Sequence, residues 1–509
     1  MRKLEKAGPQ KLNILIIASE MEPYAKAGGL ADVASSLARA LKDRGHDVRV
    51  VIPKYSQIAT SRLELKEAVQ PMGVWMGNTE EWCAAYRLID NYGVPVYFID
   101  HSLYFQREGL YHNHLMHDYD DNPVRFGFFS RAALQLCKDI GFRPDIIHVN
   151  DWQSALAAAY LKIWHWNDTI LGTAASVLTI HNIAYQGIYS KHHVDYLGLG
   201  WHNFTEEKME TFDRINLLKA GIYYADMITT VSPTFAKDII SPHGGFGLAP
   251  YLSNRSHHLC GIVNGIDTNV WNPQTDELIP HNYSSSNLRG KSLCKKALQK
   301  RFHLNVDHSV PVIGIIGRFV EQKGFHILAE SICGILDTMN VQFAILGSGE
   351  HDLQNFFINL PSRYSGKAGS FIGFDNERAH LIEAGADFFL MPSLFEPCGL
   401  NQLYSQRYGT IPIVRATGGL NDTVENFNEQ TGCGSGFKFN DPTPDALYHT
   451  VKWALSIYEK KPSQFKTMIK RVMDLDLSWK KSAQQYENIY TRAIQKKQYE
   501  EQGYRSYYW

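Results

Sequence analysis

Short apolar segments alternate with longer segments of helical periodicity along the first half of the chain. Residues 12–18 (LNILIIA) are apolar on both faces, which is typical of a strand buried in a parallel sheet. A glycine pair then leads into a helical pattern at 30–42, and the next apolar segment, 47–52, ends at a proline. This order predicts a strand–helix–strand unit that opens with a glycine-rich turn. Further strands are expected at 94–99, 145–149, 176–180 and 227–231, and helices at 132–139 and 153–164.

The same pattern starts again after about residue 258. Strands that alternate with helices predict parallel sheets with right-handed crossovers. We therefore expect an α/β protein of two Rossmann-like, doubly wound domains that face each other across a deep cleft. The domains would comprise residues 1–258 and 259–477, with a C-terminal helix, 478–509, packing back on the first. In the second domain, strands are expected at 312–317, 341–346, 387–391 and 411–414, and a helix at 325–339.

Composition and charge exclude several classes of protein. Of 509 residues, 44% are hydrophobic and 20% are charged, which excludes a chain that is mainly disordered. The net charge of −1 argues against a strongly basic nucleic-acid binder. No apolar run is long enough to span a membrane, and 12–18 is too short for a signal-peptide core, so we expect a cytoplasmic protein. The seven cysteines are scattered and the histidines lack HExxH spacing, which argues against a metal site.

Two Gly-Gly turns follow predicted strands. Lys26, Gly28 and Gly29 lie where the first strand turns into a helix, and such a turn offers free N–H groups and a cation to a phosphate. The alternative is a tight turn with a solvated lysine. A second turn, Thr417-Gly418-Gly419-Leu420, follows the strand 411–414 and would offer another helix N-terminus.

Two cations and a carboxylate follow strands of the second domain. Arg318 and Lys323 come after the strand 312–317, and ligands of parallel sheets bind at the carboxyl ends of strands. The two cations could therefore converge on an anion, such as a phosphoryl leaving group, unless they are only solvated. Glu396 lies in a loop between two prolines, and Cys398 and Gly399 are expected to start a helix there. Glu396 and these amides could bind sugar hydroxyls and phosphate, or the glutamate could be structural.

Three residues at strand ends of the first domain are further candidates. His181 and Asn182 follow the strand 176–180, and Asp151 follows 145–149, so all three would face the predicted cleft. A histidine at a strand end is often only a hydrogen-bonding residue of the fold. Cys398 could instead be a nucleophile, but no histidine or aspartate partner is near it in the sequence.

These segments together resemble the bacterial and plant glycogen and starch synthases. Seven matches run in the order of that family over nearly the whole chain. They are SEMEPYAKAGGLADV (19–33), HVNDWQSAL (148–156), TIHNIAYQG (179–187), GIVNGID (261–267), GRFVEQKG (317–324), PSLFEPCGLNQLYSQRYG (392–409) and ATGGLNDTV (416–424).

The resemblance implies the GT-B fold and a retaining glucosyl transfer from ADP-glucose to the non-reducing end of glycogen or a malto-oligosaccharide. Together with the charge, the short apolar runs and the cysteine and histidine spacing, this reaction leads us to expect no metal, cofactor, nucleic acid or membrane as a partner. Lys26 and Gly29 would contact the donor diphosphate, with Asp32 holding their loop, and Arg318 and Lys323 would bind the phosphates of the departing ADP. The residues implied around the sugar, base and acceptor are Glu396, Cys398, Gly399, Leu400, Gly419, Leu420, His181, Asn182, Asp151, Phe374, Glu20 and Tyr111.

Two departures from related patterns limit this transfer of roles. Many glycosyltransferases of this fold have a second glutamate eight positions after the first, where this chain has Tyr404. The family's HxHDWH motif here reads HVNDWQ, so proton-transfer roles of the replaced histidines do not carry over.

Two rival functions stay open at this point. One is another nucleotide-sugar enzyme of the fold, such as a sucrose- or trehalose-forming transferase or an epimerase, and the other is a non-catalytic glucan-binding scaffold. The sequence does not decide between ADP and UDP, nor does it give the oligomeric state. The final segment, YRSYYW, fits either a frayed tail or a surface that stacks on sugar rings.

Overall fold

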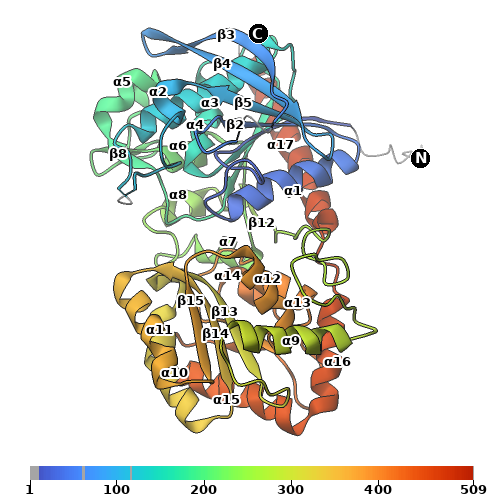
Figure 1. Cartoon of the computed structure of the whole chain (residues 1–509). Helices are drawn as coiled ribbons and strands as arrows, with labels where there is room; N and C mark the ends of the chain where they lie inside the picture. Colours follow the sequence, from blue (N-terminus) through green and yellow to red (C-terminus); the bar gives the residue numbers. More distant parts are fainter. Residues whose placement is uncertain (1–10, 60–62, 115–116, 508–509) are drawn as a thin grey trace, which may run out of the picture. The chain divides into compact units, whose positions relative to one another are not determined.

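The structure is a computed structural model, and it describes residues 11–59, 63–114 and 117–507, with side chains up to residue 500 (Figure 1). The aromatic end of the chain therefore lies outside the described side chains. None of the described helices is long and apolar enough to cross a bilayer.

The chain divides into two compact units. The first runs up to Val231 and adds Ala236–Ile262 and everything from Trp479 on, and the second comprises Ser232–Phe235 and Val263–Ser478. The sequence analysis placed the first boundary at 258/259. The boundary lies later because β12 (Leu259–Gly261) pairs in parallel with β11 (Met227–Thr230) and so belongs to the first sheet.

The first unit is built on a nine-stranded sheet in the order β12-β11-β7-β6-β1-β2-β5-β4-β3. The strands from β12 to β5 are parallel, and β4 and β3 are antiparallel at one edge. The strands of this unit are β1 (Asn13–Ile17), β2 (Asp47–Pro53), β3 (Lys66–Met76), β4 (Thr79–Ile89), β5 (Pro95–Asp100), β6 (Ile146–Asn150), β7 (Ala175–Ile180), β8 (Ile188–Ser190), β9 (Glu210–Thr211), β10 (Arg214–Asn216), β11 and β12.

Helices cover this sheet. The long α17 (Trp479–Tyr507) returns to the first unit, as expected for the end of the chain, and buries one face on it. The others are α1 (Gly29–Asp43), α2 (Ser102–Phe105), α3 (Asn122–Asp139), α4 (Asp151–Ile163), α5 (Val194–Leu197), α6 (Leu217–Tyr224), α7 (Pro233–Asp238), which spans the unit boundary, α8 (Ala249–Asn254) and the 3-10 turns Lys191–His193, Trp201–Asn203 and Ser256–His258.

Helix α3 begins ten residues before the helix predicted at 132–139. Its first turns are buried on nearly all sides, so they lack the polar face by which helical periodicity is recognised. Arg125 is fully buried there, and its guanidinium donates to the carbonyl of Tyr104 and to Asn122 Oδ1, both at 2.6 Å. These hydrogen bonds stabilise the buried guanidinium. From the sequence pattern alone, an arginine would be expected on the surface.

The second unit contains a six-stranded parallel sheet in the order β15-β14-β13-β16-β17-β18. Its core lies on both faces of that sheet. The strands are β13 (Val312–Phe319), β14 (Gln342–Gly349), β15 (Ala368–Ile372), β16 (Phe388–Met391), β17 (Ile411–Arg415) and β18 (Phe437–Phe439). The helices are α9 (Arg289–Arg301), α10 (Phe325–Thr338), α11 (His351–Arg363), α12 (Asn376–Gly385), α13 (Asn401–Arg407), α14 (Gly418–Thr423), α15 (Pro444–Lys460), α16 (Pro462–Met473) and the 3-10 turn Glu321–Lys323.

Both sheets reverse their winding direction once, and this positions the candidate residues. In the first sheet the reversal lies between β1 and β6, and in the second between β13 and β16. Ligands of open parallel sheets bind outside the carboxyl ends of the strands at such a point. The loops that follow β1, β6, β13 and β16 carry most of the candidate residues of the sequence.

Candidate active site

The turn between β1 and α1 brings four predicted residues together. Residues 26–29 are exposed, and α1 begins at Gly29. Lys26 Nζ donates to Asp32 Oδ1 at 2.8 Å, so the cation is held beside the first turn of the helix. A Cβ added at Gly28 would meet no atom within 4 Å, which leaves open space over the backbone. The turn therefore presents a cation, bare backbone and a helix N-terminus on one surface.

Glu20 and Tyr111 lie beneath this turn. Glu20 is buried, and its Oε2 accepts the amides of Ala27 at 2.5 Å and Gly28 at 2.8 Å. The Tyr111 hydroxyl donates to Glu20 Oε1 and lies 2.7 Å from Ser19 Oγ. Burial beside the Glu20 carboxylate raises the pKa of Tyr111 well above its usual value, so the hydroxyl stays a donor. The two residues hold the turn in shape, and an acceptor-side role for them stays a prediction.

His181 is a neutral side chain with a defined orientation. Asn150 Nδ2 donates to the carbonyl of Ile17 at 3.1 Å, which turns Asn150 Oδ1 toward His181 Nε2 at 2.9 Å. Nε2 must therefore carry the proton, which leaves Nδ1 as an acceptor. Burial lowers the pKa of His181 to about 3, so the ring is uncharged at neutral pH. The sequence analysis missed Asn150, whose only signal was its place where the family motif has histidine.

Asp151 holds the backbone of the next strand end. Its Oδ1 accepts the amide of His181 at 2.7 Å and that of Asn182 at 3.5 Å. Asp151 has φ +52°, a conformation that non-glycine residues rarely adopt and that is often found at functional sites. Burial raises its pKa to about 7 against the opposing effect of the two amides. The structure thus joins Asp151, His181 and Asn182 in one turn.

In the second unit, Glu396 and Lys323 form an ion pair. Lys323 Nζ lies 2.6 Å from Glu396 Oε2, and Ser393 Oγ donates to the same oxygen at 3.2 Å. The Glu396 residue is only 5% exposed. Its other oxygen, Oε1, has no hydrogen-bond partner among the residues that the structure describes. One oxygen is therefore fixed by the protein and the other is open to a ligand.

The loop after β13 is locked to the loop after β16. Gln322 accepts the amide of Leu394 at 2.9 Å through its backbone carbonyl, and its side chain reaches the carbonyl of Phe395. Gly324 has φ +70°, and a Cβ there would lie 2.0 Å from the carbonyl oxygen of Pro392. Only glycine permits this approach. The ion pair therefore lies between two loops whose backbones are held together.

The second Gly-Gly turn packs on the same loop. A Cβ at Gly418 would lie 2.1 Å from the carbonyl oxygen of Glu396, and one at Gly419 would lie 2.1 Å from that of Cys398. The amide of Gly419 donates to the carbonyl of Glu396 at 3.0 Å, and that of Leu420 to Thr417 at 3.0 Å. These amides bind the chain itself. The turn thus has a packing role, and its contact with phosphate stays a prediction.

The expected helix start at Cys398 and Gly399 is wrong. Helix α13 begins at Asn401, after Leu400, because Gly399 has φ +71° and an α-helix cannot run through this conformation. Burial raises the pKa of the Cys398 thiol to about 12. A neutral thiol is a poor nucleophile, so a nucleophilic role is disfavoured.

Arg318 and Phe374 are exposed. Arg318 lies at the end of β13, beside Ser348 of β14, and its guanidinium has no hydrogen bond or ion pair within the described part of the chain. Phe374 follows β15 and is 90% exposed, so one or both ring faces are open for stacking. The structure places Arg318, Lys323 and Glu396 on adjacent strand ends, while Phe374 follows the edge strand of the sheet.

Tyr404 occupies the position of the second glutamate, and it is buried in an aromatic stack. Its ring lies 3.8 Å from that of Trp271 at an interplanar angle of 13°. The ring of His380 also stacks on Trp271, and their centroids are 4.1 Å apart. A carboxylate would be desolvated in this environment, so the stack accounts for a tyrosine at this position.

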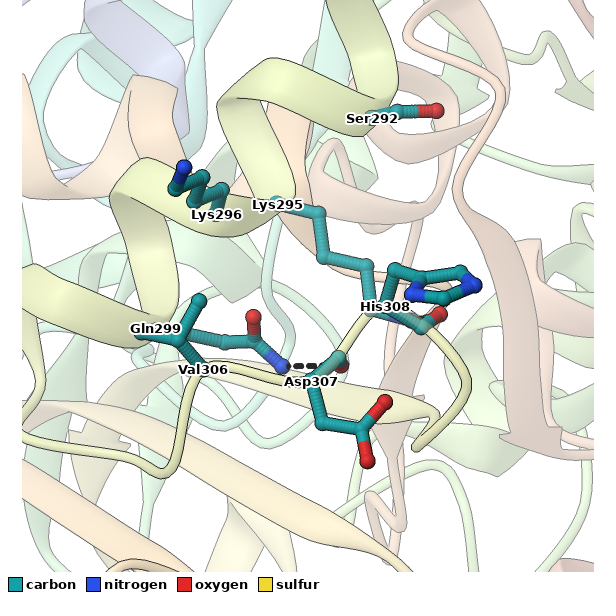
Figure 2. Close-up of a pocket in the computed structure, with 7 residues that line it drawn as sticks. All are labelled: Ser292, Lys295, Lys296, Gln299, Val306, Asp307 and His308. Carbon is teal, nitrogen blue, oxygen red and sulfur yellow. Dashed lines mark hydrogen bonds between the residues drawn. The ribbon is translucent and has the colours of Figure 1, made fainter.

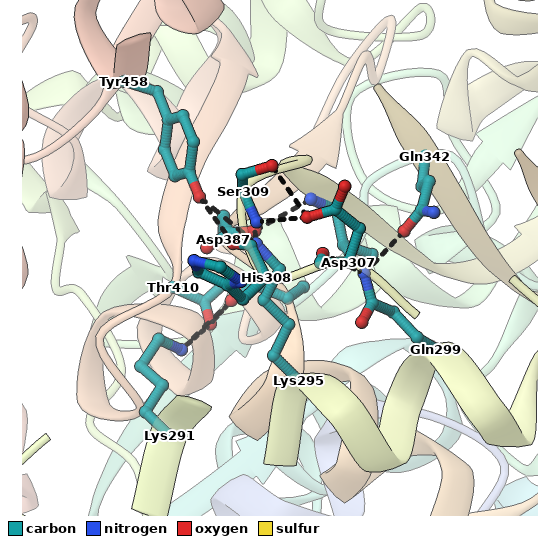
Figure 3. A network of polar contacts seen from close by, with 12 residues as sticks. Lys291, Lys295, Gln299, Asp307, His308, Ser309, Gln342, Asp387, Thr410 and Tyr458 are labelled. Carbon is teal, nitrogen blue, oxygen red and sulfur yellow. Dashed lines mark hydrogen bonds and ion pairs between the residues drawn. The ribbon is translucent and has the colours of Figure 1, made fainter. Parts of the chain in front are cut away.

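A separate hollow of about 310 Å³ lies beside α9 (Figure 2). Lys295 Nζ is bound there to Asp387 Oδ2 at 2.8 Å, the carbonyl of His308 at 3.0 Å and the Tyr458 hydroxyl at 3.2 Å (Figure 3). Asp387 precedes β16 and also accepts the amide of Val312. These contacts join α9 to the amino ends of the strands, the opposite end from the candidate site.

No cluster of three histidine, cysteine, aspartate or glutamate residues suited to a metal ion occurs within residues 11–59, 63–114 and 117–507.

Two sequence profiles match the chain. The starch synthase catalytic domain matches residues 13–254, and the group 1 glycosyl transferases match residues 297–471. Glycogen synthase 1 of Geobacter sulfurreducens is 46% identical over 96% of this chain and 97% of its own. The chain belongs to the family of glycogen and starch synthases. Glycogen synthase of Treponema denticola, another member, is 44% identical over 96% of this chain and 99% of its own.

Solved structures agree with this family and with its GT-B fold. The catalytic domain of starch synthase IV from Arabidopsis thaliana, bound to ADP and acarbose, has a TM-score of 0.88 and 34% identity, covering 96% of this chain and 100% of its own. Sucrose-phosphate synthase of Thermosynechococcus elongatus has a TM-score of 0.57 at 16% identity, which shows the fold alone. The glycogen and starch synthases are glycosyltransferases, and the candidate site must serve that class of reaction.

Proposed function

We propose that the chain transfers glucose from ADP-glucose to the non-reducing 4-hydroxyl of an α-1,4-glucan, with retention at the anomeric carbon. The observation that supports this most directly is the Lys323–Glu396 pair, held between locked loops at the point where the second sheet reverses. A relative solved with ADP and an oligosaccharide analogue supports the nucleotide and the glucan as ligands.

The two cations would bind the diphosphate of the donor. Arg318 is exposed and uncommitted within the described residues, and Lys323 keeps two of its three N–H donors after pairing with Glu396. Positive charge beside the departing phosphate stabilises the negative charge that grows as the glycosidic bond breaks. Glu396 Oε1 would accept a hydrogen bond from a hydroxyl of the donor glucose.

The reaction would proceed by front-face displacement. The bond between the anomeric carbon and the phosphate oxygen breaks, and the acceptor O4 bonds to the same face of that carbon. The proton of the acceptor hydroxyl passes to the departing phosphate oxygen, so ADP leaves and the α-configuration is kept. No second carboxylate is needed, which agrees with the buried Tyr404 at that position.

Within the first unit, we propose that neutral polar groups and one cation bind groups of the substrates. His181 Nδ1 would accept a substrate hydroxyl, because its Nε2 proton is directed to Asn150. Asp151 would act as a positioning residue through the amides of His181 and Asn182. Lys26, beside the exposed turn, would add charge for the diphosphate.

The side-chain cations make a metal ion unnecessary in this mechanism. Full activity in the presence of a chelator is therefore expected, and loss of turnover that added Mg²⁺ restores would contradict this part of the proposal.

Linkage and configuration test the proposed reaction. Incubation of ADP-glucose carrying a labelled sugar with glycogen should give label in α-1,4 linkage, released by an α-1,4-specific glucosidase and seen as an α-anomeric signal by NMR. Fructose and glucose phosphates should stay unlabelled as acceptors. Label in sucrose or trehalose derivatives, or a β-anomeric product, would contradict the proposal.

A further inference from the structure

Two tryptophans project from the edge of the first sheet. Trp75 of β3 is 54% exposed and Trp82 of β4 is 57% exposed. These two strands form the antiparallel edge ribbon of the sheet, at a distance along it from the parallel strands that carry the candidate site (Figure 1). Tryptophan is among the residues with the most apolar surface to bury, so two of them exposed on one ribbon call for an explanation.

The strand register puts both rings on the same face. Gly73 pairs with Trp82, and Trp75 pairs with Glu80. Residues that pair directly share a face, as do residues two apart on one strand. Trp75 and Trp82 are therefore diagonal neighbours on the outer face, whereas Met72 and Val74 are buried on the other.

Glu80 lies between the two rings. A Cβ at Gly73 would lie 2.5 Å from Glu80 Oε1 and 3.4 Å from the Trp82 ring. The carboxylate thus rests over bare backbone, next to Trp82 and opposite Trp75. It has no hydrogen bond or ion pair with any residue in the described part of the chain, so its oxygens are open acceptors. Apolar ring faces beside such an acceptor match a sugar, whose C–H faces are apolar and whose edge carries hydroxyls.

The ribbon is poorly suited to pairing with a protein strand. Pro71 of β3 has no N–H to donate, and the register shifts between Glu67 and Val69 and again between Val69 and Met72. Prolines, bulges and charged residues on an edge strand hinder the addition of another strand. A carbohydrate needs only the side-chain face, which these irregularities leave intact.

We propose that Trp75, Glu80 and Trp82 form a secondary binding surface for an α-glucan chain, separate from the site of transfer. This inference rests on the proposed function for the identity of the sugar polymer. A glucan that is bound at this surface has a higher effective concentration at the site of transfer. This increase requires a glucan chain that is long enough to occupy both sites at once. The surface should therefore matter for glycogen and not for a short oligosaccharide.

Kinetics with two acceptors test the proposal. In the W75A/W82A variant, the KM for glycogen should rise about tenfold, equivalent to about 1.4 kcal/mol. The kcat, the KM for ADP-glucose and the KM for maltotriose should stay unchanged. Trp166, which is 65% exposed on a loop after α4, offers a matched control, and W166A should behave as the unsubstituted chain.

Two further variants leave both tryptophans in place. G73A adds a methyl group that must displace the Glu80 carboxylate, and E80Q removes its charge while keeping its size. Each should weaken binding in a glycogen co-sedimentation assay, which needs no turnover and so stays informative if the proposed transfer reaction is wrong. Unaltered co-sedimentation of W75A/W82A, or a change of oligomeric state on light scattering in place of lost glycogen binding, would overturn the proposal.

Discussion

Arg318 and Lys323 differ in how much the fold depends on them. Lys323 pairs with a carboxylate that is almost fully buried, so its removal leaves Glu396 without its cation. Loss of one partner of a buried pair is costly to stability. Arg318 is exposed and has no partner among the described residues. A substitution at Arg318 therefore separates binding and catalysis from folding more cleanly.

We expect R318A to lower kcat about 100-fold or more, because it removes positive charge where the leaving group becomes negative. Its free energy of unfolding should stay within about 0.5 kcal/mol of the unsubstituted chain. Steady-state kinetics and urea unfolding check both expectations. Lys300, also exposed on the second unit, supplies the control: K300A should change neither quantity. An R318A enzyme with normal turnover would exclude the phosphate role.

The raised pKa of Asp151 should make the stability of the chain depend on pH. Its pKa is about 7 in the folded chain and about 4 when unfolded, so the folded state binds more protons between these values. Stability is then fully present below the unfolded pKa and falls as pH rises to 7, by up to about 1.4 kcal/mol per pH unit. Asparagine tolerates the positive φ of this position and does not titrate. The unfolding temperature of D151N relative to the unsubstituted chain should rise from pH 5 to pH 7, and a constant difference would refute the shift.

At the scale of the elements, the proposed donor-binding residues lie in the turns after β1, β13, β16 and β17. The last three are locked through backbone contacts that only glycine allows, at Gly324, Gly418 and Gly419. The turn before α1 differs, because a Cβ at Gly28 would meet nothing and its φ of −154° suits any residue. We therefore propose that close approach of a ligand, rather than the fold, requires glycine at this position.

Substitution of Gly28 by alanine tests this difference. G28A should leave the unfolding temperature unchanged and raise the KM for ADP-glucose about tenfold, about 1.4 kcal/mol, because the methyl group occupies space over the backbone. Gly334 of α10 also has open space around its Cβ position, and G334A should leave that KM unchanged. An unaltered KM in G28A would show that the donor does not approach this turn.

The sequence predicted most of the parallel strands within a few residues, because strands buried on both faces read as continuous apolar runs, but it missed β12, β15 and β18. It missed β3 and β4, whose outer face is polar and aromatic and whose register shifts twice. The motifs located the candidate residues, and the structure added what depends on contacts far apart in the chain. Examples are the buried carboxylate of Glu20 under its turn and the orientation of His181 by Asn150. Neither pairing has a local sequence pattern.

At the scale of the whole molecule, the end of the chain completes the first unit. Tyr490 of α17 is fully buried, and its hydroxyl lies 2.9 Å from His148 Nδ1 of β6. His148 Nε2 lies 2.6 Å from Thr179 Oγ1 on the neighbouring strand. Residues more than 300 positions apart thus close a polar network in the core of the first unit, and we expect the stability of this unit to depend on α17.

We expect Y490A to destabilise the first unit by about 3–5 kcal/mol, through a large cavity and a lost hydrogen bond. Y490F keeps the ring and should cost about 1 kcal/mol. Tyr499 lies on the same helix but is 79% exposed, so Y499A should stay within about 0.5 kcal/mol. Denaturant unfolding followed by circular dichroism measures all three. Equal stability of Y490A and Y499A would contradict the dependence of the unit on α17.

Nucleotide release tests the central claim most directly. The purified chain is incubated with ADP-glucose or UDP-glucose, each with and without glycogen, and free ADP or UDP is measured. We predict rapid release of ADP only when glycogen is present, with much slower release of UDP, and release by R318A that is about 100-fold slower or more. Glycogen that binds to the chain without any release of ADP, or equal release from both donors without glycogen, would contradict the account.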